Sequence, residues 1–183
     1  MDQLAEVIER RRGEYLNAFR YFIERQRREH GDGVAEVKFE VPDLQSPYRG
    51  LYCIDFVNNR EGHLTTCELQ VDHVDPFEPL SCQFGNATVI VESLNWGNVN
   101  LRYDAITLPE EKIRRWFDYW FDPDDTRLDP TSEFGGIIHQ LDLQPGLVGI
   151  DFGTAPADAM WDMLELLRAS SAFHIRVSSS DDL

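Results

Sequence analysis

The first thirty residues carry a helical pattern of apolar positions. Apolar side chains recur there at spacings of three and four residues, which places them on one stripe of a helix. The stripe consists of Leu4, Val7, Ile8, Tyr15, Ala18, Phe19, Phe22 and Ile23. Most of the arginines lie outside this stripe, namely Arg10, Arg11, Arg12, Arg25, Arg27 and Arg28. The pattern predicts one long helix over residues 2–30, ended by the glycines of the sequence HGDG.

From residue 34 the apolar positions alternate with polar ones, which is the pattern of half-buried strands. Strands are predicted at residues 34–41, 50–57, 63–71, 87–94 and 98–106. The turn sequence NNREG separates the second and third of these, and NWG separates the last two, so two hairpins are expected. We therefore predict an antiparallel meander over residues 34–106, with one face on the core and the other in water.

The second half of the chain mixes helices with strands. Residues 107–121 and 155–170 have helical spacing, with Thr107 and Thr154 as the expected N-caps. Strands are predicted at residues 135–143, 147–152 and 172–179, the first two joined by the turn QPG.

Separation of a strand run from the helices is typical of an α+β protein. We predict a single α+β domain over residues 1–183, with a largely antiparallel sheet of about seven or eight strands. A long N-terminal helix and two further helices pack on that sheet. The expected parts are the helix 1–30, the meander 34–106, the helix 107–121 and a ββαβ unit over 135–179.

The composition adds a strong negative charge. The 183 residues include 33 acids and 17 lysines and arginines, for a formal net charge of −16. Residues 1–30 hold seven arginines and six acids, so residues 31–183 carry −17. Such a field repels phosphate backbones and disfavours nucleic-acid binding, whereas it speeds association with a basic protein or a cation.

The sequence also limits the compartment and the chemistry. No apolar run approaches the roughly 20 residues that span a bilayer, and the N-terminus has no apolar signal core. A cytoplasmic protein without membrane contact is expected. Cys53, Cys67 and Cys82 are odd in number and lack C-x-x-C spacing, which predicts free thiols. The chain contains no P-loop, G-x-G-x-x-G, G-x-S-x-G or H-E-x-x-H motif, so no cofactor is predicted.

The segment WFDYWFDPDDTRLDPTSEFGG, which starts at Trp116, runs from an aromatic helix into an acidic loop. This segment is either a solvated turn or a binding surface in which aromatic contact residues are surrounded by acidic ones. The residues of the second interpretation are Tyr119, Phe121, Asp122, Asp124, Asp125, Asp129 and Glu133. Such a surface would suit a basic protein partner.

Two metal interpretations are weaker. Asp122, Asp124, Thr126 and Glu133 occupy oxygen positions one, three, five and twelve of a calcium loop. Position six, where that loop needs glycine, holds Arg127 instead. Zinc ligands are also conceivable, but no paired spacing supports them; these residues are His63, Cys67, Asp72, His73 and Asp75.

Histidine is the usual general base, so its positions were compared with the strand pattern. His139 shares a predicted strand face with Ile137 and Leu141, which favours a hydrogen-bonded core histidine. His174 and Arg176 share a face that points to solvent. If the last two strands pair, Asp151 approaches both on the outer face. His139, Asp151, His174 and Arg176 are therefore the weak candidates for catalysis or ligand binding.

Three functions follow as hypotheses. The first is a protein-binding module, most specifically an acidic inhibitor that occludes a basic protein, in the manner of bacterial toxin-neutralising immunity proteins. The second is a small-molecule binder or an enzyme with a pocket between sheet and helices. The third is a structural subunit that forms a homo-oligomer through the aromatic stripe of its N-terminal helix.

Overall fold

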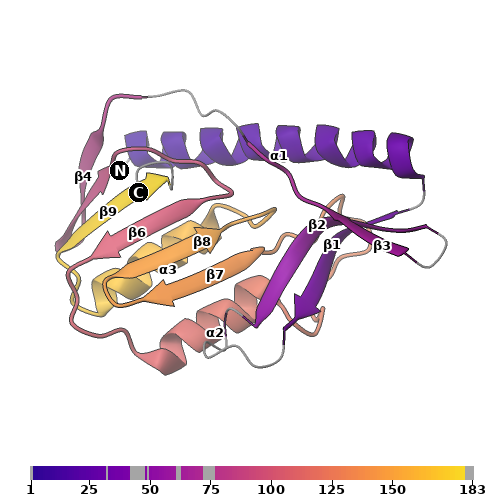
Figure 1. Cartoon of the computed structure of the whole chain (residues 1–183). Coiled ribbons are helices and arrows are strands. Elements are labelled where there is room, and N and C mark those ends of the chain that lie inside the picture. Colours follow the sequence, from indigo (N-terminus) through magenta and orange to yellow (C-terminus); the bar gives the residue numbers. More distant parts are fainter. Residues whose placement is uncertain are drawn as a thin grey trace.

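The protein has an α+β fold in which a long helix lies beside two sheets (Figure 1). The computed structural model describes residues 2–31, 33–41, 48, 50–60, 63–71 and 77–179. Within those residues the helices are α1 (Asp2–His30), α2 (Glu110–Phe121) and α3 (Asp158–Ala169). The strands are β1 (Gly33–Glu40), β2 (Leu51–Arg60), β3 (His63–Cys67), β4 (Leu80–Phe84), β5 (Ala87–Val91), β6 (Val99–Tyr103), β7 (Gln140–Gln144), β8 (Leu147–Asp151) and β9 (His174–Ser179).

The predicted meander is divided between two separate sheets. Strands β1, β2 and β3 form an antiparallel three-stranded sheet in chain order. The larger sheet has the order β4-β5-β9-β6-β8-β7 and is mixed, because β9 runs parallel to β5 and antiparallel to β6. The hairpin predicted from the sequence NWG was therefore wrong, since β9 separates β5 from β6. Strand β4 was not predicted; it pairs with β5 across the turn that contains Gly85.

The six-stranded sheet has one buried face and one open face. Apolar side chains from alternate positions fill the buried face, among them Val89, Leu101, Val148, Ile150 and Ile175. Helices α2 and α3 lie behind the sheet on that side (Figure 1). They are joined by a hydrogen bond from Nε1 of Trp116 to the carbonyl oxygen of Ala159, at 3.1 Å. The open face carries mostly polar side chains because the polar positions of the same strands point away from α2 and α3.

Helix α1 has the predicted bounds and runs past both sheets (Figure 1). Its buried stripe includes Leu4, Ile8, Tyr15, Phe19, Phe22 and Ile23, as the spacing predicted. Arg11 departs from the prediction, because it is buried within the stripe and its guanidinium lies 5.4 Å from the ring centre of Phe77. The aromatic residues of this stripe, Tyr15, Phe19 and Phe22, belong to the chain's own core.

The starts of the later helices differ from the expected N-caps. Helix α2 begins after Pro109, and no side chain caps its first turn, so Thr107 does not serve as the N-cap. Helix α3 begins after Ala157, again without a side-chain cap. Thr154 instead accepts a hydrogen bond from the amide of Gly136 at 3.0 Å, which connects the end of β8 to the segment that leads into β7.

The segment just before β7 joins the two sheets. The backbone amide of Cys53 on β2 donates to the carbonyl oxygen of His139 at 2.8 Å. The amide of His139 donates to the carbonyl oxygen of Asp151 on β8, also at 2.8 Å. His139 is therefore the backbone link between the small sheet and the large one.

Two sequence predictions are addressed directly by the described residues. The cysteines Cys53, Cys67 and Cys82 are free, as the spacing predicted. None of the helices in the described part of the chain is long and apolar enough to cross a membrane.

Candidate functional site

The link between the sheets contains three buried charged side chains. The ring of His139 is 1% exposed and lies between two carboxylates. Its Nε2 atom is 3.2 Å from Oε1 of Glu36, and its Nδ1 atom is 2.8 Å from Oδ1 of Asp55. The second contact has the distance of an ion pair without the alignment of a good hydrogen bond. We call this group of three residues the histidine clamp.

Strand pairing places the two acids of the clamp opposite each other. On β1 and β2, Ala35 pairs with Phe56 and Val37 pairs with Ile54. Glu36 and Asp55 lie between these two pairs. Glu36 has a left-handed backbone with φ of 52°, a conformation that costs of order 1–3 kcal/mol in a residue with a side chain. The surrounding contacts must therefore hold it in place.

Hydrogen bonds satisfy the remaining oxygens of the clamp. The amide of Gly135 donates to Oε2 of Glu36 at 2.7 Å, and the Thr154 hydroxyl donates to Oε1. The amide of Leu69 donates to Oδ2 of Asp55 at 2.6 Å. Buried charges are retained in proteins when they are paired and hydrogen-bonded in this way.

Gly153 fits the clamp closely. A Cβ atom at this position would lie 2.1 Å from Cδ2 of His139, and the residue has a positive φ of 49°. Both the close approach of the imidazole ring and the backbone conformation require glycine.

The clamp favours a charged imidazole. Burial alone would lower the pKa of His139, but its ion pairs with Asp55 and Glu36 outweigh that effect and raise it well above the usual value. Burial would likewise raise the pKa of Glu36, whereas its bonds to His139, Gly135 and Thr154 lower it overall. Burial raises the pKa of the neighbouring Cys53 to about 12, so its thiol stays protonated at neutral pH.

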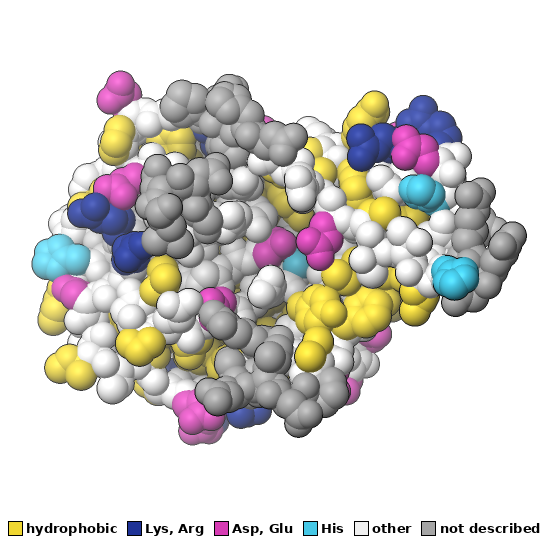
Figure 2. All heavy atoms as spheres, viewed as in Figure 1, with side chains coloured by type: hydrophobic (Ala, Val, Ile, Leu, Met, Phe, Trp, Pro, Cys, Tyr) yellow, Lys and Arg dark blue, Asp and Glu magenta, His cyan; other side chains and the backbone are white. Residues whose placement is uncertain are grey.

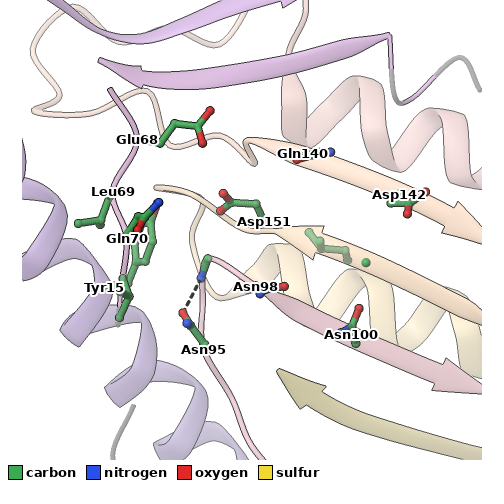
Figure 3. A pocket seen from close by; sticks show the side chains of 14 residues that line it. Tyr15, Glu68, Leu69, Gln70, Asn95, Asn98, Asn100, Gln140, Asp142 and Asp151 are labelled. Carbon is green, nitrogen blue, oxygen red and sulfur yellow. Dashed lines mark hydrogen bonds between the residues drawn. The ribbon is translucent and has the colours of Figure 1, made fainter. Parts of the chain in front are cut away.

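A polar hollow lies beside the clamp on the open face of the large sheet (Figure 3). Its volume is about 590 Å³. Strands β6, β7 and β8 form its floor, while α1 and the segment 68–71 contribute its walls. The lining residues include three carboxylates, Glu68, Asp142 and Asp151, and five carboxamides, Gln70, Asn95, Asn98, Asn100 and Gln140. Within the described part of the chain no lysine, arginine or histidine lines it.

Asp151 connects the hollow to the clamp. Its backbone carbonyl accepts from the amide of His139, and its side chain lines the hollow. One carboxylate oxygen accepts from the amide of Gly153 at 2.8 Å. Burial raises the pKa of Asp151 to about 6, the repulsion from Asp55 adds to that, and the attraction of His139 opposes it. The carboxyl group therefore changes charge close to neutral pH.

Tyr15 reaches the hollow from α1 and lies near Asp151. Its side chain is 5% exposed, and its hydroxyl forms no hydrogen bond with the described residues. A Cβ atom at Gly97 would lie 2.8 Å from the Tyr15 ring and 3.6 Å from Oδ1 of Asp151, so glycine keeps the space between them open. Burial, then the negative charges of Asp151, Asp55 and Glu36, raise the pKa of Tyr15. The hollow therefore has a negative potential.

The floor contains a flat strip at Gly149. This residue pairs with Asn100 on β6 and with Asp142 on β7, so the three positions form one row across the sheet. A Cβ atom at Gly149 would point between these two side chains, 3.5 Å from Oδ1 of Asn100. The absence of a side chain exposes backbone between two polar groups.

The acidic loop after α2 differs from the predicted binding surface. Phe121 is fully buried and stacks on Phe117 at 4.9 Å, so it is not a surface anchor. Asp122 is also buried, and its carboxylate accepts from the amide and hydroxyl of Thr126 and from the amide of Arg127. Burial opposes ionisation of Asp122, but these hydrogen bonds lower its pKa overall.

Most other acids of that loop have partners within the chain. Asp125 pairs with Lys38 at 2.5 Å, Asp129 accepts from Thr131, and Glu133 pairs with Arg20 at 2.7 Å. Asp124 is exposed, as is Tyr119, whose ring centre lies 4.3 Å from the Arg127 guanidinium.

The described residues contain no group of three or more histidine, cysteine or acidic side chains that could hold a metal ion. Of the ligands expected in the calcium interpretation, Asp122 and Thr126 are hydrogen-bonded to each other, whereas Glu133 forms an ion pair with Arg20. For zinc, His63 and Cys67 lie at opposite ends of β3. The other residues named for zinc, at 72, 73 and 75, are outside the described residues.

The four candidate catalytic residues divide into two pairs. His139 and Asp151 are adjacent through β7 and β8. His174 and Arg176 lie on β9, which β6 separates from β8, so the condition for their approach to Asp151, direct pairing of the last two strands, is not met. His174 instead pairs with Asp104 at 2.8 Å, and Arg176 pairs with Glu92 at 2.9 Å, all partly exposed.

Sequence reasoning missed Glu36 and Asp55, which complete the clamp. Glu36 alternates with apolar residues in the strand predicted over 34–41, a pattern that places it on the face opposite Val37, and its left-handed backbone changes that alternation. Asp55 did carry a signal: it is an acid within the apolar run LYCIDFV. A buried acid requires a partner, which only the three-dimensional structure identifies.

No protein-family model matches this chain, and comparison with curated proteins and with solved structures also gave no match.

Proposed function

We propose that this protein is a binding module for a basic protein partner and that the hollow on the open sheet face is its contact site. The observation that carries the proposal is the lining of the hollow, in which three carboxylates and five carboxamides occur without a cationic side chain among the described residues. The three carboxylates would repel an anionic ligand, although the carboxamide NH2 groups are hydrogen-bond donors. A basic surface would find several acceptors.

The charge distribution supports the same partner. On the face shown in Figure 2 acidic side chains lie both in the middle and at the margins, whereas lysine and arginine are absent from the middle of the coloured surface. With −17 over residues 31–183, the field attracts a basic protein over a distance set by ionic strength. An inhibitor that binds in this way acts by occlusion, and electrostatic steering increases its association rate.

The proposal is tested by identifying basic proteins that bind at low salt and measuring their association rates. Purified partners would be compared between wild type and a variant carrying Asp142→Asn and Asp151→Asn, at increasing salt. We expect the association rate of wild type to fall with salt and that of the variant to be lower at every low salt concentration. Binding that is indifferent to both salt and these substitutions would contradict the proposal.

A second function, a small-molecule binder or an enzyme, is favoured by one specific observation. The hollow has a volume within the roughly 300–1,000 Å³ of small-ligand sites, and it contains an acid with a pKa of about 6 beside a buried tyrosine. A thermal-melting screen of small polar compounds would test it. A compound that stabilises wild type but not Asp151→Asn would support this function over the first.

A further inference from the structure

The hollow has features that define its ligand more narrowly than charge alone. Tyr15 is almost fully buried, lines the hollow, and has a hydroxyl without a hydrogen-bond partner in the described part of the chain. The side chain is buried, but its oxygen is not among the buried atoms without a partner, so the hydroxyl opens onto the hollow and can accept a hydrogen bond there. This observation is independent of the number of acids around it.

Resting on the proposed function, we infer that the hollow over Asp151 and Gly149 binds one guanidinium group, carried by an arginine side chain of the partner. The group would lie over the bare backbone of Gly149. Asp151 would be its counter-ion, and the oxygens of Tyr15 and of the neighbouring carboxamides would accept the N–H groups that Asp151 does not reach.

The geometry of the floor distinguishes guanidinium from other cations. A guanidinium is planar and has five N–H donors in a fixed fork, whereas an ammonium is a compact point charge with three donors. Gly149 leaves a flat strip between Asn100 and Asp142, which suits a planar group. The acceptors come from three strands and α1, and are therefore distributed around the strip instead of converging on one point (Figure 3).

The arrangement also provides charge complementarity. One oxygen of Asp151 is held by the amide of Gly153, which fixes the carboxylate and leaves its other oxygen without a partner among the described residues. A carboxylate fixed in this way can form charge-assisted hydrogen bonds with a guanidinium. The charged imidazole of the clamp is not among the residues that line the hollow.

The test uses three matched probes: Nα-acetyl-arginine amide, its neutral isostere Nα-acetyl-citrulline amide, and Nα-acetyl-lysine amide. Binding to the full chain is followed by NMR at pH 7.5, using the backbone amide of Gly149 and the side-chain amides of the hollow. We expect the arginine probe to shift these signals. The lysine probe should bind several-fold more weakly, and the citrulline probe should leave the signals unchanged.

Two substitutions locate the binding. Asp151→Asn should lower the affinity for the arginine probe by about tenfold or more, because it removes the counter-ion of the guanidinium. Gly149→Val should abolish binding by filling the strip. Since Gly149 lacks a positive φ and the new Cβ meets only ordinary contacts, the strand should accept valine, and circular dichroism verifies the fold. Asp118→Asn, which removes an exposed charge on α2, is the matched control and should bind as wild type does.

The outcomes separate this inference from the proposed function. Equal binding of the arginine and citrulline probes, or full binding to Gly149→Val, would overturn the guanidinium site. A basic protein that binds wild type and Gly149→Val equally well would overturn the guanidinium site and leave the proposed function standing. Selective binding of the arginine probe without any basic protein partner would support the guanidinium site and overturn the proposed function.

Discussion

The acidic loop after α2 and the histidine clamp both contain carboxylates, but they use them in opposite ways. The loop has many acids close together in sequence, and most of them bind partners within the same loop or on the adjacent surface. The clamp and the hollow collect acids from residues 36, 55, 142 and 151, which are far apart in sequence.

The difference shows that density of charge along a chain does not identify a site. The acids of the loop end a helix and form turns, whereas Asp151 of the hollow has an oxygen without a partner among the described residues and lies beside a buried charged imidazole. Substitutions in the two regions test this difference through their effects on stability.

The largest effect is expected from His139→Ala. Removing the imidazole leaves Glu36 and Asp55 buried without their counter-ion, which typically costs about 3–5 kcal/mol of unfolding free energy. Chemical denaturation measures the loss. The control is His174→Ala, which removes an exposed histidine that also pairs with an aspartate and should cost less than about 1 kcal/mol.

Neutralising the clamp completely should recover part of that loss. A triple variant with Glu36→Gln, Asp55→Asn and His139→Gln contains no unpaired charge, so it should be more stable than His139→Ala alone. A His139→Ala protein as stable as His174→Ala would show that the buried clamp is not held by its ion pairs.

The second prediction concerns the pH dependence contributed by Asp151. Its pKa is about 6 in the folded protein, above the value of 3.8 for an unperturbed aspartate, so the folded state holds its proton more tightly than the unfolded state does. The stabilisation that results from the raised pKa of Asp151 is fully present below about pH 4 and is lost as the pH rises through 6. Asp151→Asn should therefore be more stable than wild type above pH 6, by about 1–3 kcal/mol.

Unfolding free energies of both proteins between pH 4 and 7.5 provide the measurement. The difference between them should increase over the lower part of that range and become constant above the pKa. A difference that does not vary with pH would show that Asp151 has the same pKa in the folded and unfolded states.

The third prediction is for the loop itself. Asp122→Ala removes an acceptor that three donors share, and it should cost about 1–2 kcal/mol, as the loss of a capping side chain does. Asp124→Ala, at an exposed neighbouring position, is the control and should leave the denaturation midpoint unchanged. Equal effects at both positions would mean that the turn does not depend on the carboxylate of Asp122.

The smallest effect is expected at Glu133. Its ion pair with Arg20 is largely exposed, since both side chains are about half accessible to solvent. Water and salt screen such a pair, so Glu133→Gln should give no detectable change in the melting temperature at 0.15 M salt. A clear loss of stability that persists at 1 M salt would place Glu133 with the buried acids instead of the surface ones.

Local structure was well predicted where the sequence pattern is long or the turn chemistry is specific. The spacing of Leu4, Ile8, Tyr15 and Phe19 defined α1, and the turn QPG correctly predicted the hairpin of β7 and β8. The position of β9 was not predictable from such signals, because strand alternation specifies a face but not a neighbour. Its insertion between β5 and β6 separated Asp151 from His174.

The site was predictable only in part for the same physical reason. His139 and Asp151 were recognised as candidates because each is a polar residue in an otherwise regular strand pattern. Glu36 and Asp55 reach His139 through the pairing of two sheets, and that pairing depends on contacts between residues about 100 positions apart. Thr154 was assigned to a helix cap, and only the folded chain shows its hydroxyl bonded to Glu36.

The place of β9 in the large sheet has a consequence for synthesis of the protein. During translation the other eight strands of the described residues leave the ribosome before β9, which then pairs with β5 on one side and β6 on the other. Until that happens the nascent chain has two unpaired strand edges, which are sites for aggregation. The large sheet can therefore close only after β9 has been synthesised, and β5 and β6 remain unjoined until then.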